Sequence, residues 1–91
     1  MKNLVAVIVK LMPDSPAANL QEIKTKAKEA LEKEGALNIT AEENPLAFGL
    51  IALYLKFAWP EEQDTSIIEQ TLLSLPNVSS LNIEDYRRIF G

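Results

Sequence analysis

The chain has 91 residues, of which 47% are hydrophobic and 24% charged, and a formal net charge of −4, which fits one globular domain over residues 1–91. It contains neither histidine nor cysteine. This excludes a disulfide framework, a thiolate metal site and the commonest general base, and a metal site would have to be built from oxygen ligands alone. Nothing in the composition favours hydrolytic or redox chemistry, and we expect no metal, no cofactor and no catalytic chemistry of its own.

The first predicted element is a strand from Leu4 to Met12, an apolar run rich in valine that stops at Pro13. Apolar residues on both faces of such a run are typical of a central strand covered on both sides. The run is too short to span a membrane and shows no signal-peptide cleavage pattern. We therefore expect a cytoplasmic protein that makes no membrane contact.

A helix is predicted to begin at about Asn19 and to end at Gly35. Asn19 and Glu22 have the spacing of a capping box, and glycine commonly follows a helix end. Apolar residues recur at helical spacing through the segment, at Leu20, Ile23, Ala27, Ala30 and Leu31.

Two strands are predicted next. Apolar and polar residues alternate from Leu37 to Glu42, which indicates a half-exposed edge strand that residues 43–45 break. A long strand follows from Gly49 to Trp59 and is stopped by Pro60. One of its faces is wholly apolar, with Ile51, Leu53, Leu55, Phe57 and Trp59.

A second helix is predicted over residues 66–74, with Ser66 and Glu69 spaced as a capping box. The acidic residues before it lack the spacing and the glycine of a calcium-binding loop. We interpret them as a solvated helix start: Glu61, Glu62 and Asp64.

The last predicted strand carries Leu81 and Ile83 and is followed by a basic, apolar tail over residues 86–91. The order of elements is therefore β-α-β-β-α-β. With right-handed crossovers, this order gives an α+β, ferredoxin-like sandwich with strand order 4-1-3-2 and both helices on one face of an antiparallel sheet.

Three passages are more specific than the topology. They are VAVIVKLMPDSP at residues 5–16, NPLAFGLIAL at 44–53 and VSSLNIEDYRR at 78–88. In this order and spacing the chain resembles archaeal elongation factor 1-beta over essentially its full length, and the C-terminal exchange domain of the eukaryotic beta subunit. The resemblance implies a translation factor that promotes exchange of GDP for GTP on elongation factor 1-alpha, a GTPase.

The resemblance also implies two contact regions. In the eukaryotic relatives an exposed phenylalanine before the third strand contacts the GTPase, and here that position is Phe48, flanked by Pro45 and Gly49. A lysine next to the C-terminus enters the magnesium site of the GTPase in those relatives. Alignment through Asn82 and Ile83 places Arg88 there, with three residues after it in place of one.

Several alternatives stay open for these residues. Either Arg87 or Arg88 can supply the cation, and arginine is larger and more forked than lysine. Without the resemblance, the two arginines are a solvated pair and Phe48 is a core residue at a strand start. Tyr86, next to the arginines, is a further candidate contact of the GTPase, and its alternative is a packing residue.

The predicted topology adds a geometric expectation. The third and fourth strands are parallel, so Phe48 and the two arginines should lie at opposite ends of the sheet, roughly 33 Å apart for a ten-residue strand. We therefore expect the GTPase to be gripped over a long surface, by two of its domains. The acidic charge and the nearly aliphatic central strands argue against direct nucleic acid binding.

Other functions share this topology. A single-stranded RNA-binding module displays two or three aromatic residues on its central strands, and polyanion affinity that falls steeply with salt would favour it. A small-molecule regulatory domain of the ACT type has a glycine-rich loop after strand one, and acylphosphatase has an arginine there. In this chain that place holds Met12–Pro16, without glycine or arginine.

Overall fold

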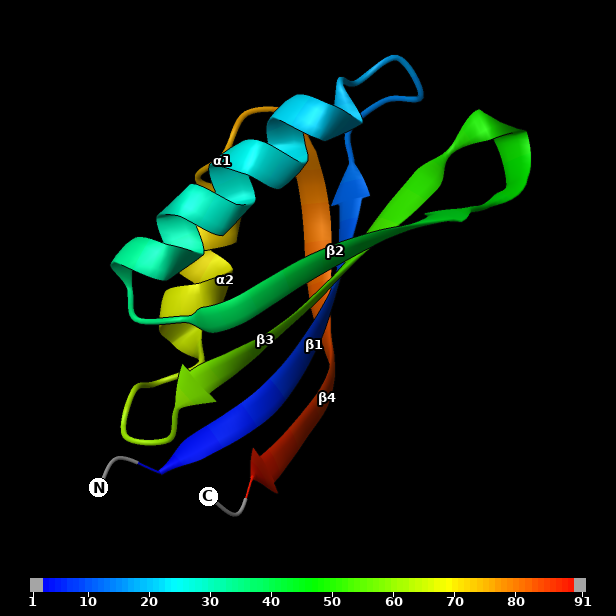
Figure 1. The fold of residues 1–91 in the computed structure, drawn as a ribbon. Coiled ribbons are helices and arrows are strands. Elements are labelled where there is room, and N and C mark those ends of the chain that lie inside the picture. The colour runs from blue at the N-terminus through cyan, green and yellow to red at the C-terminus, as the bar shows by residue number, and fades with distance from the viewer. Residues whose placement is uncertain (1–2, 90–91) are drawn as a thin grey trace.

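Residues 3–89 are described by a computed structural model, in which an antiparallel sheet carries two helices on one face (Figure 1). The strands are ordered β2-β3-β1-β4, which confirms the predicted ferredoxin-like arrangement. In these residues neither helix is long and apolar enough to cross a membrane. In chain order the elements are β1 (Leu4–Pro13), α1 (Leu20–Lys33), β2 (Leu37–Pro45), the 3-10 turn η1 (Ala47–Gly49), β3 (Ile51–Pro60), α2 (Ser66–Leu73) and β4 (Val78–Ile89).

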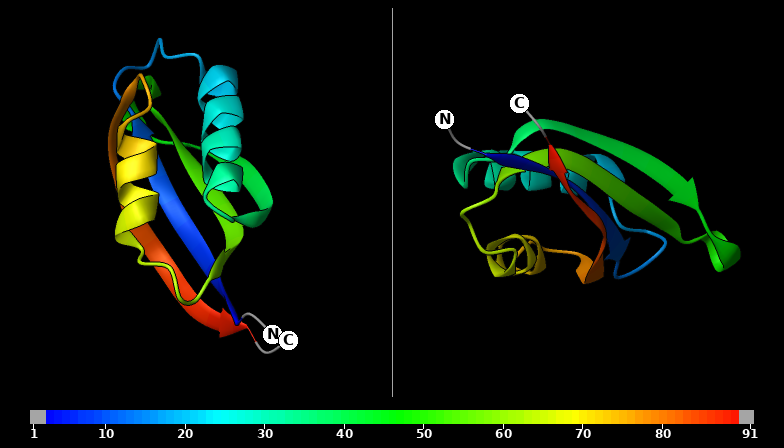
Figure 2. Two further views of the ribbon diagram at one scale, coloured as in Figure 1. Left: turned by 90° about the vertical axis from the view of Figure 1, so that its left-hand side faces the viewer. Right: turned by 90° about the horizontal axis from the view of Figure 1, so that it is seen from below.

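The central strand β1 is covered on one side only. Its alternate residues Val5, Val7, Val9 and Leu11 are buried beneath the helices. The residues between them are half-buried on the opposite face, which no helix of residues 3–89 covers (Figure 2). The prediction that both sides are covered was therefore wrong. Two crossovers of the same hand place both helices on the same face, whatever the apolarity of the strand.

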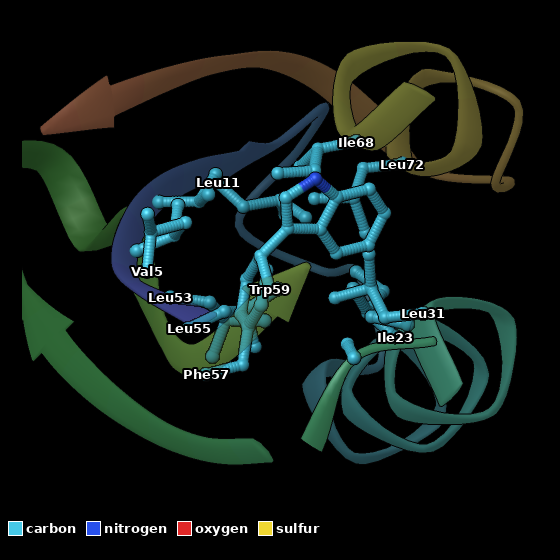
Figure 3. Close-up of a cluster of buried hydrophobic side chains, with 14 residues drawn as sticks. Val5, Leu11, Ile23, Leu31, Leu53, Leu55, Phe57, Trp59, Ile68 and Leu72 are labelled. Atoms are coloured by element: carbon cyan, nitrogen blue, oxygen red, sulfur yellow. The ribbon is translucent and has the colours of Figure 1, made fainter. Parts of the chain in front are cut away.

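Trp59 lies at the centre of the core, between the sheet and both helices (Figure 3). Its side chain is fully buried, and its ring meets that of Phe57 edge to face with the centroids 6.1 Å apart. The indole Nε1 donates a hydrogen bond to the carbonyl of Gln63 (3.2 Å), and Gln63 Nε2 donates to the carbonyl of Glu34 (2.5 Å). The loop after β3 is therefore tied both to the core and to the end of α1.

The two helices begin differently. Asn19 caps α1 as predicted, since its Oδ1 accepts a hydrogen bond from the backbone N–H of Glu22 (3.1 Å). The predicted capping box of α2 was wrong, because Ser66 lies inside the helix and Thr65 occupies the cap position without a side-chain cap bond. The Asp64 carboxylate instead accepts from the backbone N–H of Ser66 (2.9 Å).

This difference gives a stability prediction. Asn19→Ala should lower the free energy of unfolding by about 1 kcal/mol, because it leaves a helix N–H without its acceptor. Thr65→Ala, the matched change at the cap position of α2, should cost less than about 0.5 kcal/mol. Urea denaturation followed by circular dichroism measures both, and equal losses in the two variants would contradict the assignment of the caps.

The sequence misplaced several strand ends. β2 continues through residues 43–45, where Pro45 pairs with Ile51, because an edge strand tolerates a proline on its unpaired side. β3 begins at Ile51 and not at Gly49. A left-handed backbone at Asn38 (φ +56°) shifts the register of β2 and leaves Leu37 half exposed.

The predicted C-terminal tail is largely strand. β4 extends to Ile89, which pairs with Leu4 of β1, while the last two residues of the predicted tail lie outside the described residues. The main-chain hydrogen bonds to β1 do not require apolar and polar side chains to alternate. A basic segment therefore extends the strand as readily as an apolar one. Arg87 and Arg88 are therefore held in a sheet.

Candidate functional site

The loop between β2 and β3 forms the tip of a hairpin that extends away from the helices (Figure 1). Its backbone closes on itself: the N–H of Leu46 donates to the carbonyl of Leu50 (2.7 Å), and the N–H of Leu50 donates to that of Ala47 (3.3 Å). Gly49 has φ +76°, a conformation that glycine adopts without steric cost. This tight closure fixes the direction of the residues between Pro45 and Gly49.

Phe48 is unusual in both conformation and exposure. Its backbone is left-handed (φ +63°, ψ +27°), and its side chain is 95% exposed. A bulky residue in this region costs of order 1 kcal/mol, and such outliers concentrate at functional sites. An aromatic ring presented to solvent at this cost is typical of a binding residue. The core alternative for Phe48 does not apply, because the ring contacts none of the core.

The second region is the C-terminal end of β4, where consecutive residues point to opposite faces. Arg87 pairs with Ala6 in the sheet, and Arg88 pairs with Val5, whose side chain faces the helices. Directly opposed residues in antiparallel strands share a face. Arg87 therefore lies on the open face of the sheet, and Arg88 lies on the face that carries the helices.

Both arginines are exposed and both form ion pairs. Arg87 is 79% exposed and its Nε lies 2.9 Å from Asp85 Oδ2. Arg88 is 67% exposed and its Nη2 lies 2.5 Å from Glu61 Oε1. Neither guanidinium is buried, so each has donors directed to solvent. Arg88 differs in that its partner belongs to a distant segment, the loop after β3.

Tyr86 lies on the same face as Arg88 and is half exposed. It lines a surface hollow of 540 Å³ together with Ile83 and the loop after β3, residues 61–65. Within residues 3–89 no group of three or more carboxylates is placed to hold a metal. The hollow is therefore a surface depression between the half-exposed tyrosine and an acidic loop.

The two regions lie at opposite ends of the molecule. The described chain measures 44 × 21 × 19 Å, and the hairpin tip and the end of β4 mark the two ends of its sheet (Figure 1). The predicted site residues thus form two groups, with Pro45, Phe48 and Gly49 in one and Tyr86, Arg87 and Arg88 in the other. The expectation of two separated regions, based on the parallel direction of β3 and β4, agrees with this arrangement.

Comparison with known proteins identifies the family. Residues 6–89 match the model of the EF-1 guanine nucleotide exchange domain. The chain belongs to this exchange-domain family. The matched segment includes both the hairpin tip and the two arginines, so neither region is an addition outside the family's common domain.

Archaeal relatives of the exchange-domain family align over nearly the whole chain. Elongation factor 1-beta of Thermococcus gammatolerans is 40% identical over 90 residues, covering 96% of this chain and 96% of the relative. The protein of the same name from Methanobrevibacter smithii is 36% identical over 86 residues, covering 93% and 96%. That of Methanocaldococcus jannaschii is 39% identical over 74 residues, covering 80% and 83%. The resemblance read from the sequence is confirmed.

The aromatic residues on the open face of the sheet test the alternative of a single-stranded RNA-binding module. Such modules stack bases on aromatic residues of this face. Phe57 and Trp59 are buried on the helix side, and Tyr54 is the aromatic residue that opposes Lys10 and Glu42 on the open face. Among residues 3–89 the open face therefore offers one aromatic ring, which does not make a stacking platform for several bases.

Sequence reasoning missed one residue of the second region. Glu61 was interpreted as part of a solvated helix start, but its carboxylate lies against Arg88 and is only 26% exposed. The two residues are 27 positions apart in the sequence. No short-range pattern connects them, and the pairing follows from the register of β4 against β1.

Proposed function

We propose that this protein promotes the exchange of GDP for GTP on elongation factor 1-alpha, by weakening the binding of the nucleotide and its magnesium ion. Membership of the exchange-domain family supports the class of activity. The observation that carries the proposal is that both side chains which the family resemblance assigns to the GTPase are exposed, Phe48 at one end and Arg88 at the other.

In this proposal Phe48 supplies binding energy. An aromatic side chain that is almost fully exposed in the free protein has its whole apolar surface available for burial in a partner. The ring sits on a closed turn, so little conformational freedom is lost on binding. Pro45 and Gly49 hold the turn in which the ring is presented. They act through the backbone and position Phe48.

Arg88 supplies the positive charge. Magnesium bridges phosphate oxygens and protein ligands, and much of the affinity for a guanine nucleotide depends on it. A guanidinium brought to that site repels the metal and competes for its anionic ligands. Every ~1.4 kcal/mol removed from nucleotide binding is a tenfold loss of affinity, and by reciprocity nucleotide weakens binding of the exchange factor by the same factor.

The separation of the two regions favours contact with two domains of the GTPase. A rigid sheet joins the ring at one end to the guanidinium at the other. Binding by Phe48 therefore fixes where Arg88 is delivered. The chain needs no general base, nucleophile or cofactor for this activity, because the chemistry consists of displacing ligands on the partner.

Release of fluorescently labelled GDP from elongation factor 1-alpha tests the proposal. Wild-type protein should accelerate release, and Arg88→Ala should reduce the acceleration about tenfold, as expected for the loss of a charge-assisted contact of ~1.5 kcal/mol. Arg87→Ala, the matched removal of a guanidinium from the other face, should change it less than about twofold.

Arg88→Lys provides the second control, because lysine is the residue of the eukaryotic relatives and keeps the charge. It should retain at least about half of the wild-type acceleration. If wild-type protein does not accelerate release, the proposed function is wrong. If Arg87→Ala and not Arg88→Ala removes the acceleration, the cation has been assigned to the wrong arginine.

A further inference from the structure

We infer that Glu61 restrains Arg88. Its carboxylate competes with the anionic ligands of the partner's magnesium ion for the guanidinium, and so sets how readily Arg88 leaves this chain's own surface. The inference rests on the proposed function, in which Arg88 acts on that magnesium site. Glu61 touches neither nucleotide nor metal, so its role is to position Arg88.

The two side chains of the Arg88–Glu61 ion pair are unequally exposed. Glu61 is 26% exposed and Arg88 is 67% exposed, so the carboxylate is the better shielded partner. Its Oε1 accepts the hydrogen bond from Arg88 Nη2 (2.5 Å), while its Oε2 is buried and has no hydrogen-bond partner among the described residues. Arg88 is therefore the donor on which this shielded carboxylate depends, and departure of the guanidinium leaves the carboxylate poorly solvated.

The backbone around Glu61 is fixed. Its own N–H donates to the carbonyl of Asn3 (2.9 Å), and the carbonyl of Gln63 accepts from the buried indole of Trp59. Gln63 in turn donates to the carbonyl of Glu34. Because these bonds hold the loop backbone on the core and on α1, the Glu61 carboxylate follows Arg88 outward no further than its own side chain reaches. The ion pair must open when the guanidinium extends.

The net charge of the ion pair explains why Arg88 and Glu61 must separate before Arg88 can act on the magnesium site. While Arg88 and Glu61 are paired, the pair has no net charge, and a neutral pair neither repels magnesium nor attracts its carboxylate and phosphate ligands strongly. Arg88 therefore acts on the magnesium site after the pair separates. The paired state of the free protein keeps the guanidinium ordered and limits its binding to other anions, and the partner's site must outcompete Glu61 for it.

The test measures GDP release from elongation factor 1-alpha at sub-saturating concentrations of Glu61→Gln. The amide keeps the size and the hydrogen-bond acceptor of the carboxylate and removes its charge. We expect release to become about two- to fivefold faster than with wild type, the range that corresponds to loss of one partly exposed ion pair.

Glu62→Gln is the matched control. It makes the same change of charge at the next position, where the side chain is exposed and forms no ion pair within residues 3–89. It should leave the rate within about 1.5-fold of wild type. In an Arg88→Ala background, Glu61→Gln should have no effect on the rate, because the restrained group is absent.

The possible outcomes distinguish the restraint of Arg88 by Glu61 from the proposed exchange activity. An unchanged or slower rate with Glu61→Gln overturns the inference while acceleration by wild-type protein upholds the proposed function. Equal gains from Glu61→Gln and Glu62→Gln also overturn it, because they indicate a general effect of charge on association. A gain that persists in the Arg88→Ala background overturns it as well. Absence of acceleration by wild-type protein overturns both ideas. The melting temperature of each variant, followed by Trp59 fluorescence, establishes that folding is unchanged.

Discussion

Phe48→Ala should reduce the acceleration of GDP release about 30-fold at sub-saturating concentrations of the exchange factor. The ring is 95% exposed in the free protein, so truncation removes contact area that only a bound partner uses. Aromatic residues that become fully buried against a partner commonly contribute ~2 kcal/mol or more, which corresponds to this factor. Release of labelled GDP over a titration of the variant measures the effect.

The same substitution should leave the free energy of unfolding within about 0.5 kcal/mol of wild type, because Phe48 packs against none of the core. Leu73→Ala is the matched control for loss of an exposed apolar side chain, since Leu73 lies half exposed at the end of α2, away from both contact regions. Its activity should equal that of wild type. Full activity of Phe48→Ala, or equal losses in both variants, would remove Phe48 from the interface.

Trp59→Ala should have the largest effect on stability, a loss of about 3–5 kcal/mol in the free energy of unfolding. The indole is fully buried between the sheet and both helices, and it holds the loop after β3 through Gln63. Domains of this size have ~5–15 kcal/mol in total, so the variant should be partly unfolded under mild conditions. Because the sequence has one tryptophan, urea denaturation must be followed by far-ultraviolet circular dichroism.

Trp59→Phe separates packing from the hydrogen bond. Phenylalanine retains much of the buried surface but leaves the carbonyl of Gln63 without its donor. We expect an intermediate loss of about 1–2 kcal/mol. A loss below about 1 kcal/mol for Trp59→Ala would mean that the core closes around the cavity, and Trp59 would then not be the residue that fixes the loop.

The strand order and the core face were predictable from the sequence. Leu53, Leu55, Phe57 and Trp59 recur with a period of two and are buried on one face, as that period predicts. The crossover rule then fixes the topology. Asn19 has a side chain that suits a helix start, and the structure has it capping α1. These features depend on neighbours in the sequence or on rules that hold for most folds.

The face of the sheet on which each arginine lies was not predictable. Leu81 and Ile83 pack toward the core, and continued alternation would place Arg87 on their side. A register shift reverses this alternation, because Val9 pairs with Ile83 whereas the neighbouring Ile8 pairs with Asp85. The extra residue in β4 is Glu84. One such bulge exchanges the faces of all later residues, so it places Arg88, and not Arg87, within reach of Glu61.

The conformation of Phe48 also escaped prediction. A phenylalanine before a glycine in an apolar passage reads equally well as the first core residue of a strand. Its left-handed backbone follows from the closed turn between Leu46 and Leu50, which is a property of the hairpin as a whole. The family resemblance implied the exposure of the ring, but the backbone strain becomes visible only when both strands are placed.

Leu4 and Ile89 are paired neighbours in the sheet, so both ends of the described chain leave the molecule beside Arg88. A purification tag or fusion partner attached at either terminus is therefore anchored next to the guanidinium and far from the hairpin tip. Steric interference from such an attachment would lower the activity assigned to Arg88 and leave binding through Phe48 intact. Cleaved, tag-free material is accordingly the right reference for every rate measurement, and a fluorophore for binding studies is best placed on the outer surface of α1.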